Sequence, residues 1–308
     1  MDELRLEVLW IDDEPTEAFK DEAFDEGINI TNCACVNEGL KFLNDSSKVW
    51  DAIILDANCK ISGNEVEPDI SALFKAIKHI FKSNVTIPWF VYTAKSMDWS
   101  ENLRNLISDD NRIWDDRDFY NKPTQRYELF ANIKKAVENR ESFMIRQKYA
   151  VVCGFYKGAD LVELLRCYDS DDFSINTSIP NKVRQIIEWV MRYFDDRGLL
   201  PIAFTGTNIA KCSSSLGDIP QIVPIHVARS MHFCVDVCNN GSHSDEIAAN
   251  IVSGDAPYLN RSLILNLLNI LQWCPSLQKY EVEEWRKKVA QCQQETREKR
   301  EKRNKNQK

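Results

Sequence analysis

The 308-residue chain lacks any apolar run of about 18 residues, the length that crosses a membrane. Its charged N-terminus, MDELRLEVLWIDDEP, also lacks the apolar core of a signal peptide. Both absences argue against a membrane span and a secretory leader. We therefore predict a cytoplasmic protein with no membrane partner.

The ten cysteines include no Cys-X-X-Cys pair. In a cytoplasmic protein they are expected to be reduced thiols. Cys33 and Cys35 alternate within a probable strand and would share one face of it. We predict that the cysteines act as small buried hydrophobic residues.

An excess of basic residues is also absent, because the formal net charge is −8. This argues against a protein that coats nucleic acid with its whole surface. The distinctly basic segment is 283–308, which ends TREKREKRNKNQK and has no apolar residue to bury in that stretch. We predict a helix that frays into a disordered tail there, and any weak nucleic-acid contact would involve this tail.

The length predicts two domains, and Gly and Pro, ten of each, are not enriched. From residue 5 to about 140, short apolar runs alternate with amphipathic stretches, which predicts a doubly wound α/β domain. The runs VLWI, AIIL and WFVY are apolar throughout, as is typical of parallel strands covered on both faces. The expected strands are 6–11, 28–34, 52–55, 89–93 and 118–121, and the expected helices are 16–25, 38–44, 70–81, 100–107 and 125–140.

The second half predicts a mainly α-helical domain. Apolar residues recur at helical spacing in 182–195, 224–238 and 259–273, separated by loops such as KCSSSLGDIP. The helix that starts near residue 125 could run on through Phe143 and Tyr149 as a connector. The expected division is an α/β domain over 1–140, a helical connector over 141–152, a helical domain over 153–282 and the tail over 283–308.

Acidic residues follow two strands of the expected sheet. Asp12 and Asp13 come directly after the first strand, and Asp56 follows the third. Ligands bind at the carboxyl ends of parallel strands. Each residue alone has an ordinary interpretation, since Asp13 before Glu14 and Pro15 would also cap a helix. Three carboxylates together repel one another unless a cation joins them, and oxygen ligands suit Mg²⁺.

Two further residues make the set more specific. Thr93 ends the fourth strand, and Lys122 follows the fifth, so five side chains converge on one rim of the sheet. A hydroxyl can donate a hydrogen bond to a phosphoryl oxygen, and an ammonium can neutralise its charge. The set therefore contains a nucleophile, metal ligands, a donor and a cation, which are the groups an aspartyl phosphate needs.

Through VLWIDDEP, DAIILDANCK, PWFVYTA and FYNKP, in that order, residues 5 to about 140 resemble the receiver domain of two-component response regulators. The resemblance implies a flavodoxin-like fold, phosphorylation of Asp56 and Mg²⁺ bound directly by Asp13, through water by Asp12, and by the backbone carbonyl of Asn58. Thr93 and Lys122 would bind the phosphoryl group.

The same resemblance makes Phe119 the switch aromatic and the Lys122–Pro123 bond cis. It implies a histidine kinase or phosphotransfer protein as the phosphoryl source. The face made by the fourth helix, fifth strand and fifth helix would be the docking or homodimer surface. The loop after Asp56, NCKISGNEVEPD, is longer than usual and lacks the family's Met-Pro pair.

The second half shows no helix-turn-helix with a basic recognition helix. Through IPNKVRQIIEWVMRYFDDRGLLP and HVARSMHFCVDVCNNGSH it resembles HEPN-like helical domains more weakly. HEPN ribonucleases place an Arg four to six residues before a His, but no Arg occupies those positions before His243. We therefore predict a non-catalytic output domain that engages a protein partner. The alternatives are a phosphorylation-controlled ribonuclease, with Lys211 or Arg229 as the cation, and nucleic-acid binding through the tail.

A metal site is the remaining alternative in this half. The candidate ligands are His226, His232, Cys234, Cys238 and His243. Their spacing is not that of usual zinc sites, so core or loop positions are the favoured interpretation.

Overall fold

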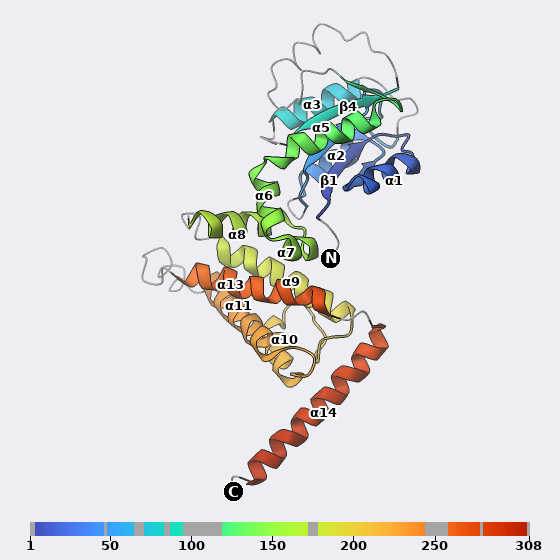
Figure 1. Ribbon diagram of the computed structural model, residues 1–308. Helices are drawn as coiled ribbons and strands as arrows, with labels where there is room; N and C mark the ends of the chain where they lie inside the picture. Colours follow the sequence, from blue (N-terminus) through green and yellow to red (C-terminus); the bar gives the residue numbers. More distant parts are fainter. Residues whose placement is uncertain are drawn as a thin grey trace. The chain divides into compact units, whose positions relative to one another are not determined.

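The computed structural model contains two compact units (Figure 1). The first comprises Met1–Ala150 and Lys157–Ala159, and the second comprises Val151–Tyr156 and Asp160–Lys308. The residues that the structure describes are 4–45, 48–64, 71–82, 87–94, 119–171, 178–243, 258–277 and 280–306.

The first unit is a five-stranded sheet with the order β2-β1-β3-β4-β5, in which all paired strands are parallel. This confirms the predicted doubly wound α/β architecture. Its elements are β1 (Leu6–Ile11), α1 (Glu17–Asp25), β2 (Ile28–Cys33), α2 (Val36–Leu43), β3 (Ala52–Leu55), α3 (Ser71–Lys82), β4 (Trp89–Thr93), β5 (Tyr120–Asn121), α5 (Arg126–Glu138) and α6 (Glu141–Lys148).

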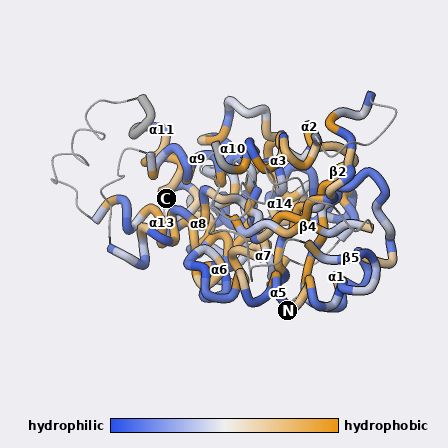
Figure 2. The backbone as a smooth tube through the Cα atoms, turned by 90° about the horizontal axis from the view of Figure 1, so that it is seen from above, coloured by the Kyte–Doolittle hydropathy of each residue, from blue (hydrophilic) through white to orange (hydrophobic). Residues whose placement is uncertain are grey.

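β1, β3 and β4 bury both faces, as their unbroken apolar runs predicted. All residues of β3 and β4 are buried, and Figure 2 shows β4 in the hydrophobic colour. Alternate side chains enter two cores: Ile53 and Leu55 pack with α2 and α3, whereas Ala52 and Ile54 pack with α1 and α5. β1, β3 and β4 have the predicted bounds, and the predicted helix 100–107 lies outside the described residues.

The connector differs from the prediction of one continuous helix. α5 ends at Glu138, Arg140 is extended, and α6 begins at Glu141. The break has a packing reason, because it lets α6 bury Phe143 in the core beside β1 and place Arg146 on Asp51.

The second unit is mainly α-helical, as predicted. Its elements are α7 (Ala150–Phe155), α8 (Ala159–Ser170), α9 (Ile179–Asp196), α10 (Ile209–Ser215), η1 (Leu216–Asp218), α11 (Ile225–His243), α13 (Leu259–Trp273), η2 (Cys274–Ser276) and α14 (Val282–Asn306). α9, α11 and α13 pack against one another through apolar residues at helical spacing. Among the described residues, no helix is long and apolar enough to cross a membrane.

α14 contains the helix predicted from residue 283 and continues through the basic repeats to Asn306, where a disordered tail was predicted. Trp285, Val289 and Cys292 are buried along one face of this helix, and Thr296 continues that face. Arg300 then pairs with Asp218 of η1 at 2.8 Å. The polar end of the sequence hid this apolar stripe, which begins before the charged repeats.

All ten cysteines lie in the described part of the chain, are buried and form no disulfide. This confirms the prediction of buried thiols.

Candidate functional site

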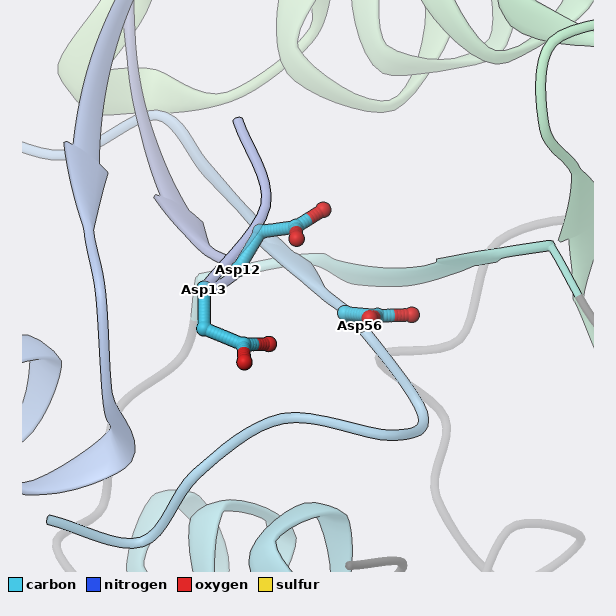
Figure 3. A group of neighbouring side chains, drawn as sticks. All are labelled: Asp12, Asp13 and Asp56. Carbon is cyan, nitrogen blue, oxygen red and sulfur yellow. The ribbon is translucent and has the colours of Figure 1, made fainter. Parts of the chain in front are cut away.

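Three carboxylates meet at the carboxyl ends of β1 and β3. Ile11 pairs with Leu55 in the parallel register, so the next residues, Asp12 and Asp56, are neighbours. The sheet ladder continues through them, because the Asp56 N–H donates to the Ile11 carbonyl at 2.9 Å. Carboxylate oxygens of Asp12, Asp13 and Asp56 all lie within 4.8 Å of one another, and Figure 3 shows the three side chains extending to the same side.

Burial makes this negative charge costly. The Asp12 side chain is fully buried, and the Asp56 side chain is only 11% exposed. Burial, with a smaller contribution from the charge of Asp12, raises the pKa of Asp56. Lys122, the Thr93 hydroxyl and the Asn58 backbone N–H oppose this rise. The site therefore needs positive charge to keep Asp56 in the nucleophilic carboxylate form.

Lys122 supplies part of that charge from the end of β5. Its ammonium pairs with Asp12 and lies 3.5 Å from Asp56 Oδ2. Its backbone N–H donates to the Thr93 carbonyl at 2.8 Å, which fixes its position beside β4. The Lys122–Pro123 bond is cis, as predicted.

Aromatic rings also lie near the Lys122 ammonium. The Lys122 Nζ lies 5.9 Å from the centroid of the Trp10 ring and 5.6 Å from that of Tyr92. Phe19 packs against both rings at centroid distances of 4.5 and 5.0 Å. A cation at these distances from a ring face is attracted to it, so the rings help to hold Lys122.

The donor set fits Mg²⁺. The three side chains provide hard oxygen ligands of the kind that Mg²⁺ prefers. Asp56 Oδ1 is buried and has no hydrogen-bond partner among the described residues, as expected of an atom kept for a ligand. The Asn58 backbone N–H lowers the pKa of Asp56, and the metal-binding role of the Asn58 carbonyl stays a prediction.

Thr93 ends β4, as predicted, and Phe119 directly precedes β5. Thr93 is buried at the last position of β4, and its hydroxyl lowers the pKa of Asp56. Phe119 is partly buried and packs against the core on the α2 and α3 side. Its switch role stays a prediction, and the predicted fourth helix of the docking face lies outside the described residues.

Lys60 is a site residue that sequence reasoning missed. Its Nζ lies 3.6 Å from Asp13 Oδ2. A signal was present, because apolar and polar residues alternate after Asp56: Ala57 and Cys59 are buried, whereas Asn58 and Lys60 are partly exposed. The unusual loop sequence hid this alternation.

Among the described side chains, the predicted residues of the second unit do not form a comparable group. His243 is the last residue of α11. Cys234 and Cys238 are buried in the helical core, whereas the half-exposed His232 pairs with Asp236 at 3.5 Å. Within the described part of the chain, Asp12, Asp13 and Asp56 are the group with metal-binding distances.

Comparison with known proteins finds receiver domains among the solved structures. One is a response regulator receiver domain protein from Clostridium thermocellum, with 17% identity and a TM-score of 0.32, covering 45% of this chain and 99% of that chain. Another is the signal receiver domain of a proposed Luxo repressor protein from Vibrio parahaemolyticus, with 21% identity and a TM-score of 0.32. This match covers 43% of this chain and 93% of that chain. No protein-family model and no curated protein matches the chain. Similarity at this level carries no information on activity or partner, so the functional argument rests on the site.

Proposed function

We propose that the first unit is a receiver domain that accepts a phosphoryl group on Asp56, and that the chain is a two-component response regulator. The observation that carries this proposal is the environment of one buried carboxylate. Asp56 lies beside Asp12 and Asp13, within reach of Lys122, and the Thr93 hydroxyl opposes the rise of its pKa. These groups match the needs of phosphoryl transfer to a carboxylate.

The proposed step is a transfer from a phosphohistidine of a kinase or phosphotransfer protein. A carboxylate oxygen of Asp56 attacks phosphorus, the new P–O bond forms, and the P–N bond breaks. The leaving imidazole keeps the electron pair and takes a proton from solvent. Lys122 and Thr93 hold the phosphoryl oxygens by charge and by an O–H hydrogen bond.

Positive charge is the second requirement of the step. Mg²⁺, when held by Asp12, Asp13 and Asp56 with the carbonyl of Asn58, supplies charge that offsets the incoming phosphoryl group. Lys122 alone faces two carboxylates, Asp12 and Asp56, so it cannot neutralise the phosphorylated site. The proposed reaction is therefore Mg²⁺-dependent.

The proposed response is a rearrangement at the end of β4 and β5. Phosphorylation adds about −1.5 to −2 charge units. The Thr93 hydroxyl would bond the phosphoryl group, and the movement of Thr93 would make room for Phe119. The helical second unit would then engage a protein partner, without a reaction of its own.

Intact-mass measurement with a small phosphodonor tests the acceptor. We expect one phosphoryl group on wild type with Mg²⁺, none on Asp56→Asn and none after chelation of the metal. Asp21→Asn, the same change at an exposed position on α1, is the matched control and should be labelled like wild type. Labelling of Asp56→Asn would rule out Asp56 as the acceptor, and metal-independent labelling would rule out the role of the carboxylates.

An RNA-cleavage assay tests the assignment of the second unit. We expect no cleavage by wild type with or without beryllofluoride, a phosphoryl mimic, because an imidazole alone leaves the charge that develops on phosphate to water. Cleavage that His243→Ala abolishes would replace the non-catalytic assignment by the ribonuclease.

A further inference from the structure

We propose that Lys60 is an internal competitor of Mg²⁺ at the site, so that this lysine sets the metal concentration at which Asp56 becomes reactive. The inference rests on the proposed function of the first unit and extends it to a residue outside the predicted set. It starts from the ion pair between Lys60 Nζ and Asp13 Oδ2, at 3.6 Å.

The backbone around Lys60 is fixed by α2. The first N–H groups of a helix lack partners within the helix and need acceptors elsewhere. Here the N–H groups of Val36 and Asn37 donate to the carbonyls of Lys60 and Ile61, each at 3.0 Å. The loop after β3 therefore caps α2 and cannot move away without losing both bonds.

Side-chain alternation along this loop then directs Lys60 to the carboxylates. Ala57 and Cys59 are both about 1% exposed and belong to the core on the α2 and α3 side. Asn58 and Lys60 alternate with them, and the Lys60 side chain stays 31% exposed while its ammonium reaches Asp13. Lys60 thus approaches the site from solvent, whereas Lys122 approaches it from the sheet.

Charge balance gives this contact its consequence. The two lysines divide the three carboxylates, because Lys122 contacts Asp12 and Asp56 and Lys60 contacts Asp13. Two ammonium groups leave the cluster with one uncompensated negative charge instead of three. An ammonium bound to Asp13 and a divalent cation bound to the same carboxylate repel each other, so each weakens the other's binding.

The partial exposure of Lys60 determines how strongly it weakens Mg²⁺ binding and whether Mg²⁺ can displace it. A partly exposed pair is weak, so Mg²⁺ can displace it. The lysine would therefore raise the metal concentration required without preventing binding. Lys122 cannot act as a displaceable competitor of Mg²⁺ in this way, because its contact with Asp12 is more deeply buried.

The test is titration calorimetry of the unphosphorylated full-length protein with MgCl₂. We expect Lys60→Met, which keeps the aliphatic stem, to bind Mg²⁺ about three- to tenfold more tightly than wild type. Lys60→Arg keeps the charge and should stay within about twofold of wild type. Lys41→Met, an equal loss of charge at an exposed position of α2, is the matched control and should also stay within that range.

Equal or weaker Mg²⁺ binding by Lys60→Met would overturn the inference, and so would an equal gain in Lys41→Met. Beryllofluoride capture at saturating Mg²⁺ provides the second measurement. Unchanged capture by Lys60→Met is expected, whereas a loss would assign Lys60 to the phosphoryl group instead of the metal. Failure of the receiver proposal itself is distinguishable, because it would show as labelling of Asp56→Asn whatever residue 60 is.

Discussion

In the part of the first unit that the structure describes, three charged side chains are buried: Asp12, Asp51 and Arg146. In the described part of the second unit, the buried polar side chains are neutral: they are Ser213, Ser215, Ser230, Asn260 and Thr296. A buried serine is satisfied cheaply by a helix carbonyl, as when Ser213 Oγ donates to Ala210 and Ser215 Oγ donates to Cys212. Buried charges need specific partners, and groups held in this way can do chemistry. This difference is consistent with the proposal that the phosphoryl chemistry belongs to the first unit.

The buried pair between Asp51 and Arg146 gives the largest expected effect. Arg146→Met leaves Asp51 without its cation, although the Glu7 N–H still donates to Asp51 Oδ2 at 2.8 Å. We expect the first unit to lose about 3–5 kcal/mol of unfolding free energy. Burial already raises the pKa of Asp51, so the loss should shrink at low pH as the carboxyl becomes neutral. Scanning calorimetry of the full chain measures it, with Mg²⁺ identifying the transition of the first unit.

The matched change in the second unit is Arg184→Met. Arg184 pairs with Glu188 at 3.0 Å, and both side chains are partly exposed. We expect a cost below about 1 kcal/mol. Adding Asp51→Asn to Arg146→Met should restore part of the lost stability, because the amide needs no counter-ion. Equal costs for Arg146→Met and Arg184→Met would remove the proposed difference between the units.

Two glycines, one in each unit, allow a comparison with an intermediate expected change in unfolding free energy. A Cβ on Gly39 of α2 would lie 2.3 Å from Cδ1 of Ile11, the residue before Asp12. A Cβ on Gly154 of α7 meets nothing within 4 Å. We expect Gly39→Ala to cost about 1–2 kcal/mol, since overpacking outweighs a helix-propensity gain of about 1 kcal/mol. Gly154→Ala should stabilise the second unit by about 0.5–1 kcal/mol. Calorimetry that shows Gly39→Ala to be stabilising would mean that Ile11 repacks freely.

Asp56→Asn should raise stability, although it abolishes the proposed reaction. The pKa of Asp56 is raised in the folded protein, chiefly by burial, so the folded state binds this proton more tightly than the unfolded state. The stabilising contribution of Asp56 is therefore present at low pH and is lost as pH rises through its raised folded-state pKa.

At neutral pH without Mg²⁺, we expect the Tm of Asp56→Asn to exceed that of wild type by a few degrees, corresponding to about 1 kcal/mol. The gap should close as pH falls toward about 4, near the unfolded-state pKa of Asp. A lower Tm for Asp56→Asn at neutral pH would show that the hydrogen bonds and Lys122 outweigh burial.

The end of α14 carries the smallest expected effect. Residues 297–308 contain seven basic and two acidic residues, in a chain with a net charge of −8. We expect at most weak binding to single-stranded RNA, which is lost with rising salt because counterion release drives it. A chain ending at Thr296 keeps the buried face of α14 and should lose this binding. Equal binding by the two chains in low-salt fluorescence anisotropy would exclude the basic end as the contact.

The sequence predicts the rim of the sheet well because that rim depends on local patterns. Apolar runs such as WFVY locate the strands, and the parallel arrangement then brings Asp12, Asp56 and Thr93 to one edge. The contact between Asp51 and Arg146 could not be predicted, because it joins residues far apart in the sequence through the turn at Arg140. The contact of Lys60 with Asp13 was not predicted for a related reason, since the position of Lys60 depends on how the loop after β3 caps α2.

The buried cysteines have a practical consequence for following motion in each unit separately. Burial raises the pKa of Cys33, Cys59 and Cys238 to about 12, so at neutral pH they are protonated and react slowly with alkylating reagents. Modification requires local opening, and its rate at each thiol reports how often that region opens. Cys33 and Cys59 flank the carboxylate site, and Cys238 lies within α11. Peptide-resolved alkylation of the wild-type protein can therefore compare local opening in both units, before and after the proposed phosphorylation.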